Sequence, residues 1–352
     1  MVDCVFFLDT TSQNNWGCHS TTYFTKQKLT NLGYNIKFNM TLHQSLVLSN
    51  VVELTKKIKK NNIKYVFING EGALYEQHDI KGKNMIKFIL LLNSFDCKIF
   101  LINSCFDLKS RDNITNFKKC LTENFNFHIR EPVSLKKFNS FFPNFETVFQ
   151  PDYLYLIYKQ LDQYQEESYL STFNLVKKNY IVIGGNSNYY RSDRKPYDAI
   201  SVYTKMIDLI KKNTDKELVL YASSEEEINW LNTISRKTNI KYFHVKKVNW
   251  RKAFVLLSNA YLSISGRYHP TIMSIIGLTP SLMFSANHCK MNGVNEMFFE
   301  NQNVINSHEI HNNFDYIIDF IKQEPKKYNN TSDNIKLKLE KYYKIVDEIK
   351  FI

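Results

Sequence analysis

One stretch of the chain brings together the residue types that hold an anion and move a proton. It reads Ser265-Gly266-Arg267-Tyr268-His269-Pro270. Arginine is a permanently charged, forked donor for phosphate or carboxylate, and histidine can give or take a proton near neutral pH. An apolar run ends at the first residue, Gly266 permits a turn, and Pro270 suits the first turn of a helix. We therefore expect an active-site loop here; a capping histidine and a surface arginine are the alternative.

Two neighbouring segments would extend this anion site. The run Gly184-Gly185-Asn186 follows the apolar sequence YIVI, and Arg191 and Arg194 come shortly after it. A Gly-Gly-Asn loop at a strand end can wrap a phosphate or a sugar, although Gly-Gly turns also occur without a ligand. Lys290 follows the next apolar run and adds a cation. We expect all of these residues to contribute to one anion-binding site.

A glutamate in the first half could serve as the base. Asn69-Gly70-Glu71-Gly72 directly follows the apolar run YVFI. Glycines on both sides of Glu71 allow close backbone approach and positive φ. We expect its carboxylate to lie in a crevice and not in the core, where it could accept a proton from a sugar hydroxyl. A tight turn with an exposed glutamate is the alternative.

Two further polar segments lie at predicted strand ends in the first half. Asn15-Trp16-Gly17-Cys18-His19 opens the first predicted helix, where free backbone N–H groups could bind an anion. A long capped turn, with His19 as a capping or surface residue, is the alternative. Arg130 follows another apolar run; contact with a ligand and an ion pair with Glu131 or a nearby carboxylate both stay open.

The elements that position these loops alternate between short apolar runs and amphipathic stretches of helical length. Such alternation is typical of a mainly parallel sheet covered on both faces. The expected strands are 5–8, 35–38, 65–68, 98–102, 127–129, 147–149, 180–183, 218–221, 241–245, 261–264 and 281–284. The expected helices are 19–32, 50–60, 82–92, 114–121, 133–138, 197–212, 225–237, 250–258, 269–276 and 333–352.

The alternation pauses at the polar, Tyr-rich stretch 153–178 and then restarts. We therefore predict an α/β protein with two tandem Rossmann-like doubly wound domains facing a cleft. The first domain would span 1–170, the second 171–325 and a helical tail 326–352. Open parallel sheets bind ligands at the carboxyl ends of their strands, which is where the segments above lie.

Composition narrows the class of protein. With 352 residues, 43% of them hydrophobic, the chain can form two packed cores. It has no apolar run of ~18 residues and no basic N-terminal signal region, and its six cysteines show no CxxC spacing. These features predict a cytoplasmic protein with reduced thiols and no metal site.

The formal net charge of +12 favours anionic partners. Nucleic acid is the weakest candidate, because the sequence contains no zinc finger, RNP-type motif or dense arginine block. Phosphorylated substrates fit the charge, and so does peripheral contact with the anionic inner face of a membrane.

The ordered motifs resemble those of the polysaccharide pyruvyl transferases. The most specific is a Ser-x-Arg-x-His segment, a helix, then Gly-x-x-Pro and a strand leading to a lysine, here Ser265 to His269, Gly277 to Pro280 and Lys290. The Asn-x-Gly loop at Asn15, the glycine-rich strand end at Asn69 and the Arg-Glu-x-x-Ser stretch at Arg130 are also similar.

The resemblance implies a GT-B-like arrangement, in which 1–170 is the acceptor-side domain and 171–325 the donor-binding domain. The donor-side residues would be Ser265, Gly266, Arg267, Gly184, Gly185, Asn186 and Lys290, and the residues on the acceptor side of the cleft would be Asn15, Trp16, Gly17, His19, Asn69, Gly70, Gly72 and Arg130. The resemblance further implies transfer of a pyruvyl group from phosphoenolpyruvate to a sugar of a cell-surface polysaccharide or its lipid-linked precursor, with no added cofactor. His269 would act as acid or ligand at the donor, Arg267 with Arg130 or Lys290 would hold its phosphate and carboxylate, and Glu71 would be the base. Glu71 interrupts what is usually a run of glycines in the family. A carboxylate facing the acceptor suits an inverting glycosyltransferase, so a nucleotide-sugar donor is the alternative.

Overall fold

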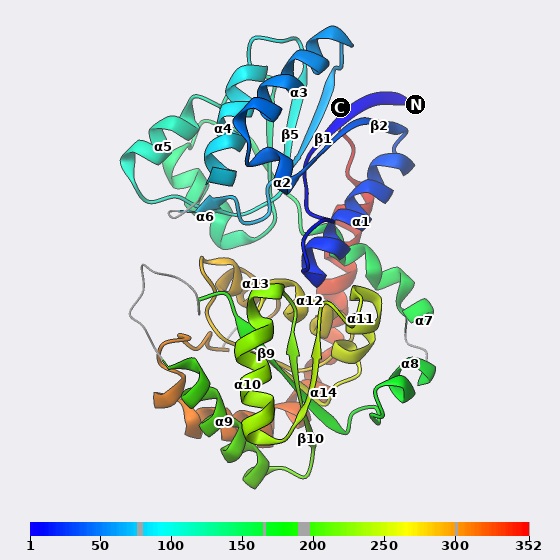
Figure 1. The fold of residues 1–352 in the computed structure, drawn as a ribbon, viewed down its shortest axis with the longest axis vertical. Coiled ribbons are helices and arrows are strands. Elements are labelled where there is room, and N and C mark those ends of the chain that lie inside the picture. The colour runs from blue at the N-terminus through cyan, green and yellow to red at the C-terminus, as the bar shows by residue number, and fades with distance from the viewer. Residues whose placement is uncertain (76–79, 165–166, 189–197, 300–301, 352) are drawn as a thin grey trace. The chain divides into compact units, whose positions relative to one another are not determined.

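A computed structural model describes residues 1–75, 80–164, 167–188, 198–299 and 302–351. Arg191 and Arg194 lie outside these ranges. The chain divides into two compact units (Figure 1). Unit 1 comprises Met1–Gln13, Thr21–Tyr153 and Ile345–Ile352, and unit 2 comprises Asn14–Ser20 and Leu154–Lys344.

Unit 1 is built on a parallel six-stranded sheet of order β2-β1-β3-β5-β7-β8. Its strands are β1 (Val2–Asp9), β2 (Tyr34–Thr41), β3 (Tyr65–Asn69), β5 (Lys98–Ser104), β7 (Phe125–Ile129) and β8 (Thr147–Phe149). A second, two-stranded parallel sheet pairs β4 (Leu74–Tyr75) with β6 (Phe106–Asp107). Its helices are α1 (Trp16–Asn31, which begins in unit 2), α2 (Leu42–Ser45), α3 (Leu48–Lys60), α4 (Ile80–Leu92), α5 (Arg111–Lys118) and α6 (Pro132–Phe141).

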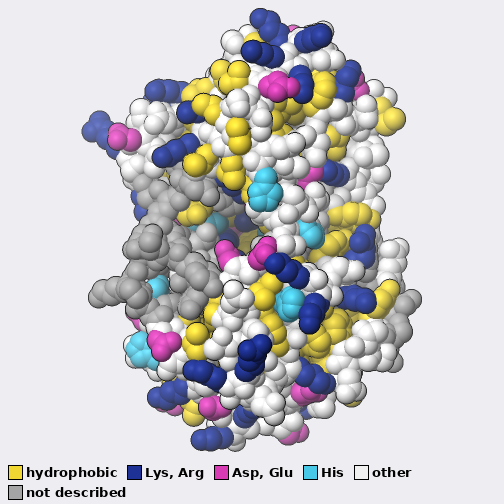
Figure 2. Space-filling view, viewed as in Figure 1, with side chains coloured by type: hydrophobic (Ala, Val, Ile, Leu, Met, Phe, Trp, Pro, Cys, Tyr) yellow, Lys and Arg dark blue, Asp and Glu magenta, His cyan; other side chains and the backbone are white. Residues whose placement is uncertain are grey.

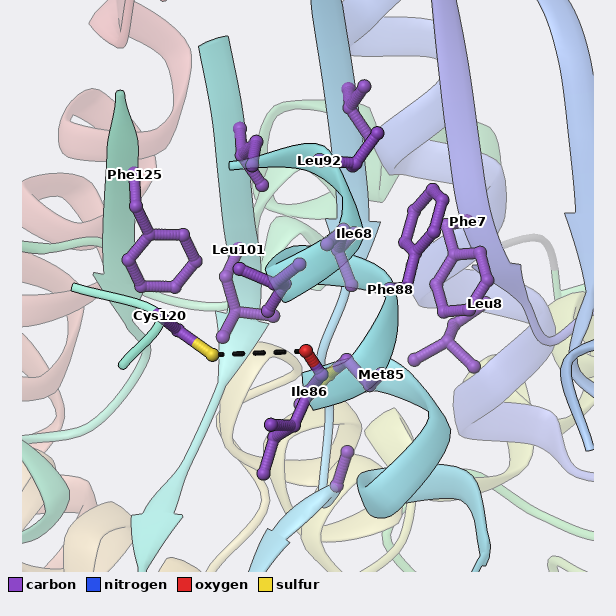
Figure 3. Close-up of a cluster of buried hydrophobic side chains, with 14 of the residues drawn as sticks. Phe7, Leu8, Ile68, Met85, Ile86, Phe88, Leu92, Leu101, Cys120 and Phe125 are labelled. Atoms are coloured by element: carbon purple, nitrogen blue, oxygen red, sulfur yellow. Dashed lines mark hydrogen bonds between the residues drawn. The ribbon is translucent and has the colours of Figure 1, made fainter. Parts of the chain in front are cut away.

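Apolar side chains from the strands and from α4 form the core of unit 1 (Figure 3). Phe7 of β1 stacks on Phe88 of α4 with ring centroids 4.2 Å apart. The thiol of Cys120 reaches the Ile86 carbonyl at 3.9 Å and is fully buried. Strands that are buried along most of their length explain why the sequence shows continuous apolar runs and not a polar alternation.

Unit 2 repeats this architecture with a parallel five-stranded sheet of order β11-β10-β9-β12-β13. Its strands are β9 (Tyr180–Asn186), β10 (Glu217–Ala222), β11 (Lys241–His244), β12 (Leu262–Gly266) and β13 (Ser281–Met283). The helices between and after them are α9 (Ala199–Asn213), α10 (Ile228–Thr238), α11 (Trp250–Ser258), α12 (Tyr268–Ile276), α13 (Lys290–Phe298) and α14 (Phe314–Glu348). The predicted α/β class with parallel sheets is confirmed, and each predicted strand occurs.

Each sheet has one point where the strand order reverses. In unit 1 this point lies between β1 and β3, and in unit 2 it lies between β9 and β12. At a reversal the two loops that leave the carboxyl ends of the strands run to opposite faces of the sheet and leave a crevice for ligands. Glu71 follows β3, and Arg267 follows β12, so both reversal points carry residues that the sequence analysis selected.

The two units differ in extent from the domains expected at 1–170 and 171–325. The stretch 153–178 contains a 3₁₀ helix, Tyr153–Gln160, and the short helices α7 (Leu161–Tyr164) and α8 (Glu167–Thr172), and from Leu154 onward it belongs to unit 2. The expected tail helix is part of the longer α14, and the residues from Ile345 onward pack within unit 1. Contacts made by Tyr34 and Phe100 with Phe351 account for this last difference.

Lysine and arginine side chains are spread among acidic and uncharged ones on the face shown in Figure 2. Within the described ranges, no helix has the length and apolar character needed to cross a membrane.

Candidate active site

The segment selected first from the sequence connects β12 to α12. Arg267 is the N-cap residue, with extended backbone (φ −110°, ψ 124°), and its N–H donates to the Ser265 hydroxyl at 3.0 Å. A Cβ added at Gly266 would lie 2.4 Å from the Cβ of Asn186, so only glycine allows β12 and β9 to approach this closely here. The predicted order of strand, turn and helix is therefore confirmed.

The guanidinium of Arg267 is held by three side chains from the segment that follows β10. Nε donates to Oε1 of Glu227 at 2.8 Å, Nη2 donates to the Ser224 hydroxyl at 2.9 Å, and Nη2 also pairs with Oε1 of Glu226. The Arg267 side chain is 10% exposed, that of Glu227 is 1% exposed, and that of Glu226 is 53% exposed. Arg267 is thus fixed by one buried and one half-exposed carboxylate.

Glu227 links Arg267 to the backbone of the segment after β10 through hydrogen bonds. Its Oε2 accepts from the N–H groups of Ser223 and Ser224, at 3.1 and 3.3 Å, and from the Ser223 hydroxyl at 3.2 Å. Burial raises the pKa of Glu227, and the charge of Arg267 acts in the opposite direction. With its oxygens satisfied by these donors, the carboxylate is a structural anchor for both the arginine and the loop.

This anchor was not predicted from the sequence, although a signal for it was present. The run Ser-Ser-Glu-Glu-Glu directly follows the apolar sequence of β10, and Ser224 with Glu227 forms a capping box. A serine followed three residues later by glutamate marks a helix start, so the motif could be read as a local cap. Its second role, the pairing with Arg267, joins residues that are 40 positions apart in the chain.

Glu226 lies under the influence of two cations. Burial opposes its ionisation, but the charge and hydrogen bond of Arg267, the Ser224 hydroxyl and the charge of Lys290 together hold the pKa of Glu226 below its ordinary value. Lys290 begins α13 and is half-buried. Arg267 and Lys290, which were both expected on the donor side, therefore act on the same carboxylate.

The loop after β1 packs against the same segment of unit 2. The N–H of Trp16 donates to the Ser223 carbonyl at 3.0 Å, and Glu225 donates its N–H to the Asn14 carbonyl at 2.9 Å. The indole of Trp16 is fully buried, stacks on Tyr221 and donates to the Val248 carbonyl at 2.6 Å. Trp16 was expected to line an acceptor site in the first domain; a fully buried, hydrogen-bonded indole in unit 2 corrects that expectation.

Gly17 lies directly against His269. A Cβ built on Gly17 would be 2.0 Å from Nδ1 and 2.4 Å from Cγ of the imidazole. The Oδ1 of Asn15 caps this end of α1 by accepting from the N–H groups of Gly17 and Cys18, at 2.9 and 3.2 Å. His269 and His19 are both half-buried. Asn15 and Gly17 therefore belong to unit 2, where Gly17 lies against His269.

Gly184, Gly185 and Asn186 lie within β9 and not in a loop after it, which corrects the expected phosphate-wrapping loop. All three are buried. A Cβ at Gly184 would be 2.3 Å from the ring of Tyr221, and one at Gly185 would be 2.1 Å from Oε1 of Glu227. The glycines are required because these two side chains pack across the face of β9.

In unit 1, Glu71 follows β3 between Gly70 and Gly72 and has a positive φ of 40°. It is 6% exposed, and Oε1 accepts from the Thr10 hydroxyl at 2.8 Å and from Nδ2 of Asn69 at 2.9 Å. The expected carboxylate in an open crevice is therefore corrected to a buried one. It does lie at the reversal point of the sheet, held in place by donors from β3 and from the loop after β1.

Arg130 forms a buried ion pair, one of the two alternatives left open by the sequence. It is 2% exposed, and Nη1 lies 3.0 Å from Oδ2 of Asp152. Its Nε donates to the thiol of Cys105 at 3.1 Å, while Thr21 donates to the other oxygen of Asp152 at 2.9 Å. Glu131 instead caps α6.

Among the residues that the structure describes, no group of three or more His, Cys, Asp or Glu side chains could hold a metal ion.

Known structures that resemble the chain share its fold at low identity. The Staphylococcus aureus protein MnaA, solved with UDP, is 13% identical with a TM-score of 0.64, and the match covers 100% of this chain and 99% of MnaA. UDP-GlcNAc 2-epimerase from Neisseria meningitidis, solved with UDP-GlcNAc, is 10% identical with a TM-score of 0.63, covering 99% and 95%. A glycosyltransferase from Rickettsia africae is 12% identical with a TM-score of 0.55, covering 99% of each chain. These proteins have a GT-B-type fold, and this chain shares it.

No curated protein matches the chain significantly. The family model for polysaccharide pyruvyl transferase matches residues 26–288, which is well over half of the chain. The match contains the Ser265 to His269 segment and the 223–227 segment that anchors it, whereas Asn15 to Gly17 and Lys290 lie just outside. The chain belongs to the polysaccharide pyruvyl transferase family and is a transferase.

Proposed function

We propose that this protein transfers the pyruvyl group of phosphoenolpyruvate to a sugar carrying two suitably placed hydroxyls. The observation that supports this proposal is the arrangement at the reversal point of unit 2. Arg267 and His269 both lie at the start of α12, directly after β12, and the charges of Arg267 and Lys290 both act on Glu226. An arginine and an imidazole at one strand end, with a lysine whose charge acts on the same carboxylate, suit a small donor that carries both a phosphate and a carboxylate.

The proposed chemistry assigns a proton donor and anion-binding groups to unit 2. An acid, for which His269 is the candidate, protonates the methylene carbon of phosphoenolpyruvate and makes the adjacent carbon electrophilic. A first sugar hydroxyl attacks that carbon, inorganic phosphate leaves, and a second hydroxyl closes the ketal. Of the two hydroxyl protons released, one replaces the proton that became part of the methyl group, and the other leaves on phosphate. Arg267 and Lys290 are the groups proposed to hold the anions.

We assign Glu71 of unit 1 as the candidate base for a sugar hydroxyl. The hydrogen bonds from Thr10 and Asn69 fix the orientation of its carboxylate, as positioning of a general base requires. Arg130 receives no ligand role, because both partners of its ion pair with Asp152 are buried, whereas Arg267 has a half-exposed carboxylate partner. Glu71→Gln should lower turnover while leaving binding of phosphoenolpyruvate intact, and unchanged turnover would remove Glu71 from the mechanism.

A nucleotide-sugar donor is the second candidate, favoured by the fold shared with proteins that were solved with UDP and UDP-GlcNAc. A ligand that binds only the folded state raises the melting temperature, so thermal shift separates the two donors. We expect stabilisation by phosphoenolpyruvate. Stabilisation by nucleotide sugars alone would reject pyruvyl transfer in favour of glycosyl transfer.

The acceptor proposed is a glycan or a lipid-linked sugar precursor. A lipid-linked acceptor would require contact with a membrane surface, toward which a net charge of +12 is attracted when the lipids are anionic. Sedimentation with phosphatidylglycerol vesicles, but not with neutral phosphatidylcholine vesicles, is the expected result. Absence of binding to both would favour an acceptor that is free in solution.

A further inference from the structure

Arg267, which is proposed to bind the donor, already forms ion pairs with two carboxylates of the protein. Nε of Arg267 is taken by Glu227, and Nη2 is shared between Ser224 and Glu226. One guanidinium charge thus faces two carboxylate charges, so the immediate surroundings of Arg267 are negative before the charge of Lys290 is counted. An anionic donor that approaches Arg267 meets this negative charge.

The two carboxylates differ in how firmly they are held. Glu227 is fully buried and accepts hydrogen bonds from two backbone N–H groups and a hydroxyl, so moving it would break the turn that starts α10. Glu226 is half-exposed, and its side chain is held by Arg267 and by the Ser224 hydroxyl at 3.3 Å. Rotation of Glu226 into solvent therefore leaves the fold and the buried pair unchanged.

The carboxylate of Glu226 also lies at a position where an anion interacts favourably with both Arg267 and Lys290. Its carboxylate pairs with Nη2 of Arg267, and the charge of Lys290 acts on it as well. A phosphate or carboxylate of a ligand in this position would gain the same two interactions that Glu226 has. A carboxylate side chain and an anionic ligand group are chemically equivalent partners for a guanidinium.

We infer that Glu226 occupies, in the protein without donor, the place of a donor anion on Arg267, and that the donor displaces it on binding. This inference rests on the proposed function in taking Arg267 as a donor-binding residue. Glu226 is then a determinant of donor affinity: it weakens binding of every anion at this place, and a donor that also engages Lys290 and His269 overcomes the competition best.

The inference predicts that removing the charge of Glu226 tightens anion binding. Glu226→Gln retains the size and the hydrogen-bonding oxygen but competes without a charge, and Glu226→Ala removes the competitor. Isothermal titration with phosphoenolpyruvate should give a dissociation constant about three- to tenfold lower for Glu226→Gln than for the wild type. The KM for phosphoenolpyruvate should fall similarly, with kcat changed much less, because Glu226 has left the arginine once the donor is bound.

Glu217→Gln is the matched control. Glu217 begins β10, at the end of the strand opposite to Ser223, and pairs with Lys241 at 2.8 Å while 41% exposed. The Glu217→Gln substitution removes the same unit of charge from the other end of β10, away from Arg267. The dissociation constant of the Glu217→Gln variant for phosphoenolpyruvate should equal that of the wild type. This result would separate local competition at Arg267 from the effect of a general increase in positive charge.

Parallel titrations with inorganic phosphate and with UDP separate this inference from the proposed function. Tighter binding of phosphate or UDP by Glu226→Gln, with no binding of phosphoenolpyruvate by any form, would reject the proposed donor and support displacement. Binding of phosphoenolpyruvate by the wild type that stays equal or weakens in both Glu226 variants would overturn displacement and leave the donor in place. If no form binds any of the three anions, the inference is wrong, since it requires that the variants open Arg267 to anions.

Discussion

Gly17 of α1 and His269 of α12 are in direct contact, with the imidazole packed where a side chain of residue 17 would be. A Cβ at Gly17 would lie 2.0 Å from Nδ1 and 2.6 Å from Cβ of His269. Gly17→Ala should therefore rotate or push back the imidazole. Misplacement of a catalytic group by about 1 Å costs on the order of a hundredfold in rate, and we expect a loss of kcat of that size in steady-state assays.

A double mutant separates this effect from a general disturbance. In Gly17→Ala alone, the clash should lower the melting temperature even though alanine is the better helix former. In a His269→Gly background both the ring and the Cβ are absent, so the same substitution should cause no loss of stability. If Gly17→Ala destabilises both backgrounds equally, the two residues are not coupled and the contact does not position His269.

Glu227 should matter for stability far more than Glu226, although both pair with Arg267. Glu227→Gln takes the buried, charged acceptor away from Nε of Arg267 and from two backbone N–H groups, and should cost about 3 kcal/mol of unfolding free energy in urea denaturation. Glu226→Gln is the control, because its half-exposed pair should contribute about 0–1 kcal/mol. Equal losses in the two variants would contradict the distinction between a fixed and a displaceable carboxylate.

The local arrangement around Arg267 could be predicted from the sequence, but its partners could not. A glycine, an arginine and a proline between an apolar run and a helical pattern sufficed to place strand, turn and helix. The pairing of Arg267 with Glu227 depends on the sheet order β10-β9-β12, and nothing in the local sequence encodes that order.

Long-range contacts also explain why Trp16 and two glycines of β9 lie elsewhere than predicted. Trp16 occurs in a polar segment, so its neighbours suggested an exposed loop, whereas a long-range stack on Tyr221 and a carbonyl partner bury it in unit 2. Gly184 and Gly185 suggested a phosphate loop because glycine permits close approach to any group. Here the groups that approach them are Tyr221 and Glu227 of the protein itself.

His128 should make the stability of unit 1 depend on pH. It is 3% exposed, its Nδ1 lies 2.6 Å from Oε1 of Gln150, and burial lowers its pKa from 6.5 to about 4, partly offset by that hydrogen bond. Between these values the unfolded chain binds a proton that the folded chain does not. The stabilisation is therefore complete above pH 6.5 and is lost as the pH falls toward 4, by about 3 kcal/mol in all.

The comparison that checks this pH dependence is between the wild type and His128→Asn, whose amide can still bond to Gln150. Carboxylates also titrate at the acid end of the range, but they do so in both proteins. The difference in unfolding midpoint between the two should therefore shrink or reverse from pH 7 to pH 4.5. A constant difference across that range would show that His128 does not titrate on unfolding.

Phe351 should stabilise unit 1 despite its position at the end of the chain. Its ring lies edge-to-face against Phe67 and Phe100, with centroids 4.9 and 5.0 Å apart, and its carbonyl accepts from the Tyr34 hydroxyl at 2.9 Å. Burying an aromatic ring in this way means that Phe351→Ala should cost about 3–5 kcal/mol, measured by urea denaturation. Val148→Ala, at a 40% exposed position of β8, should stay within about 0.5 kcal/mol of the wild type. A Phe351 variant as stable as the Val148 variant would mean that the residues after α14 contribute nothing to the core of unit 1.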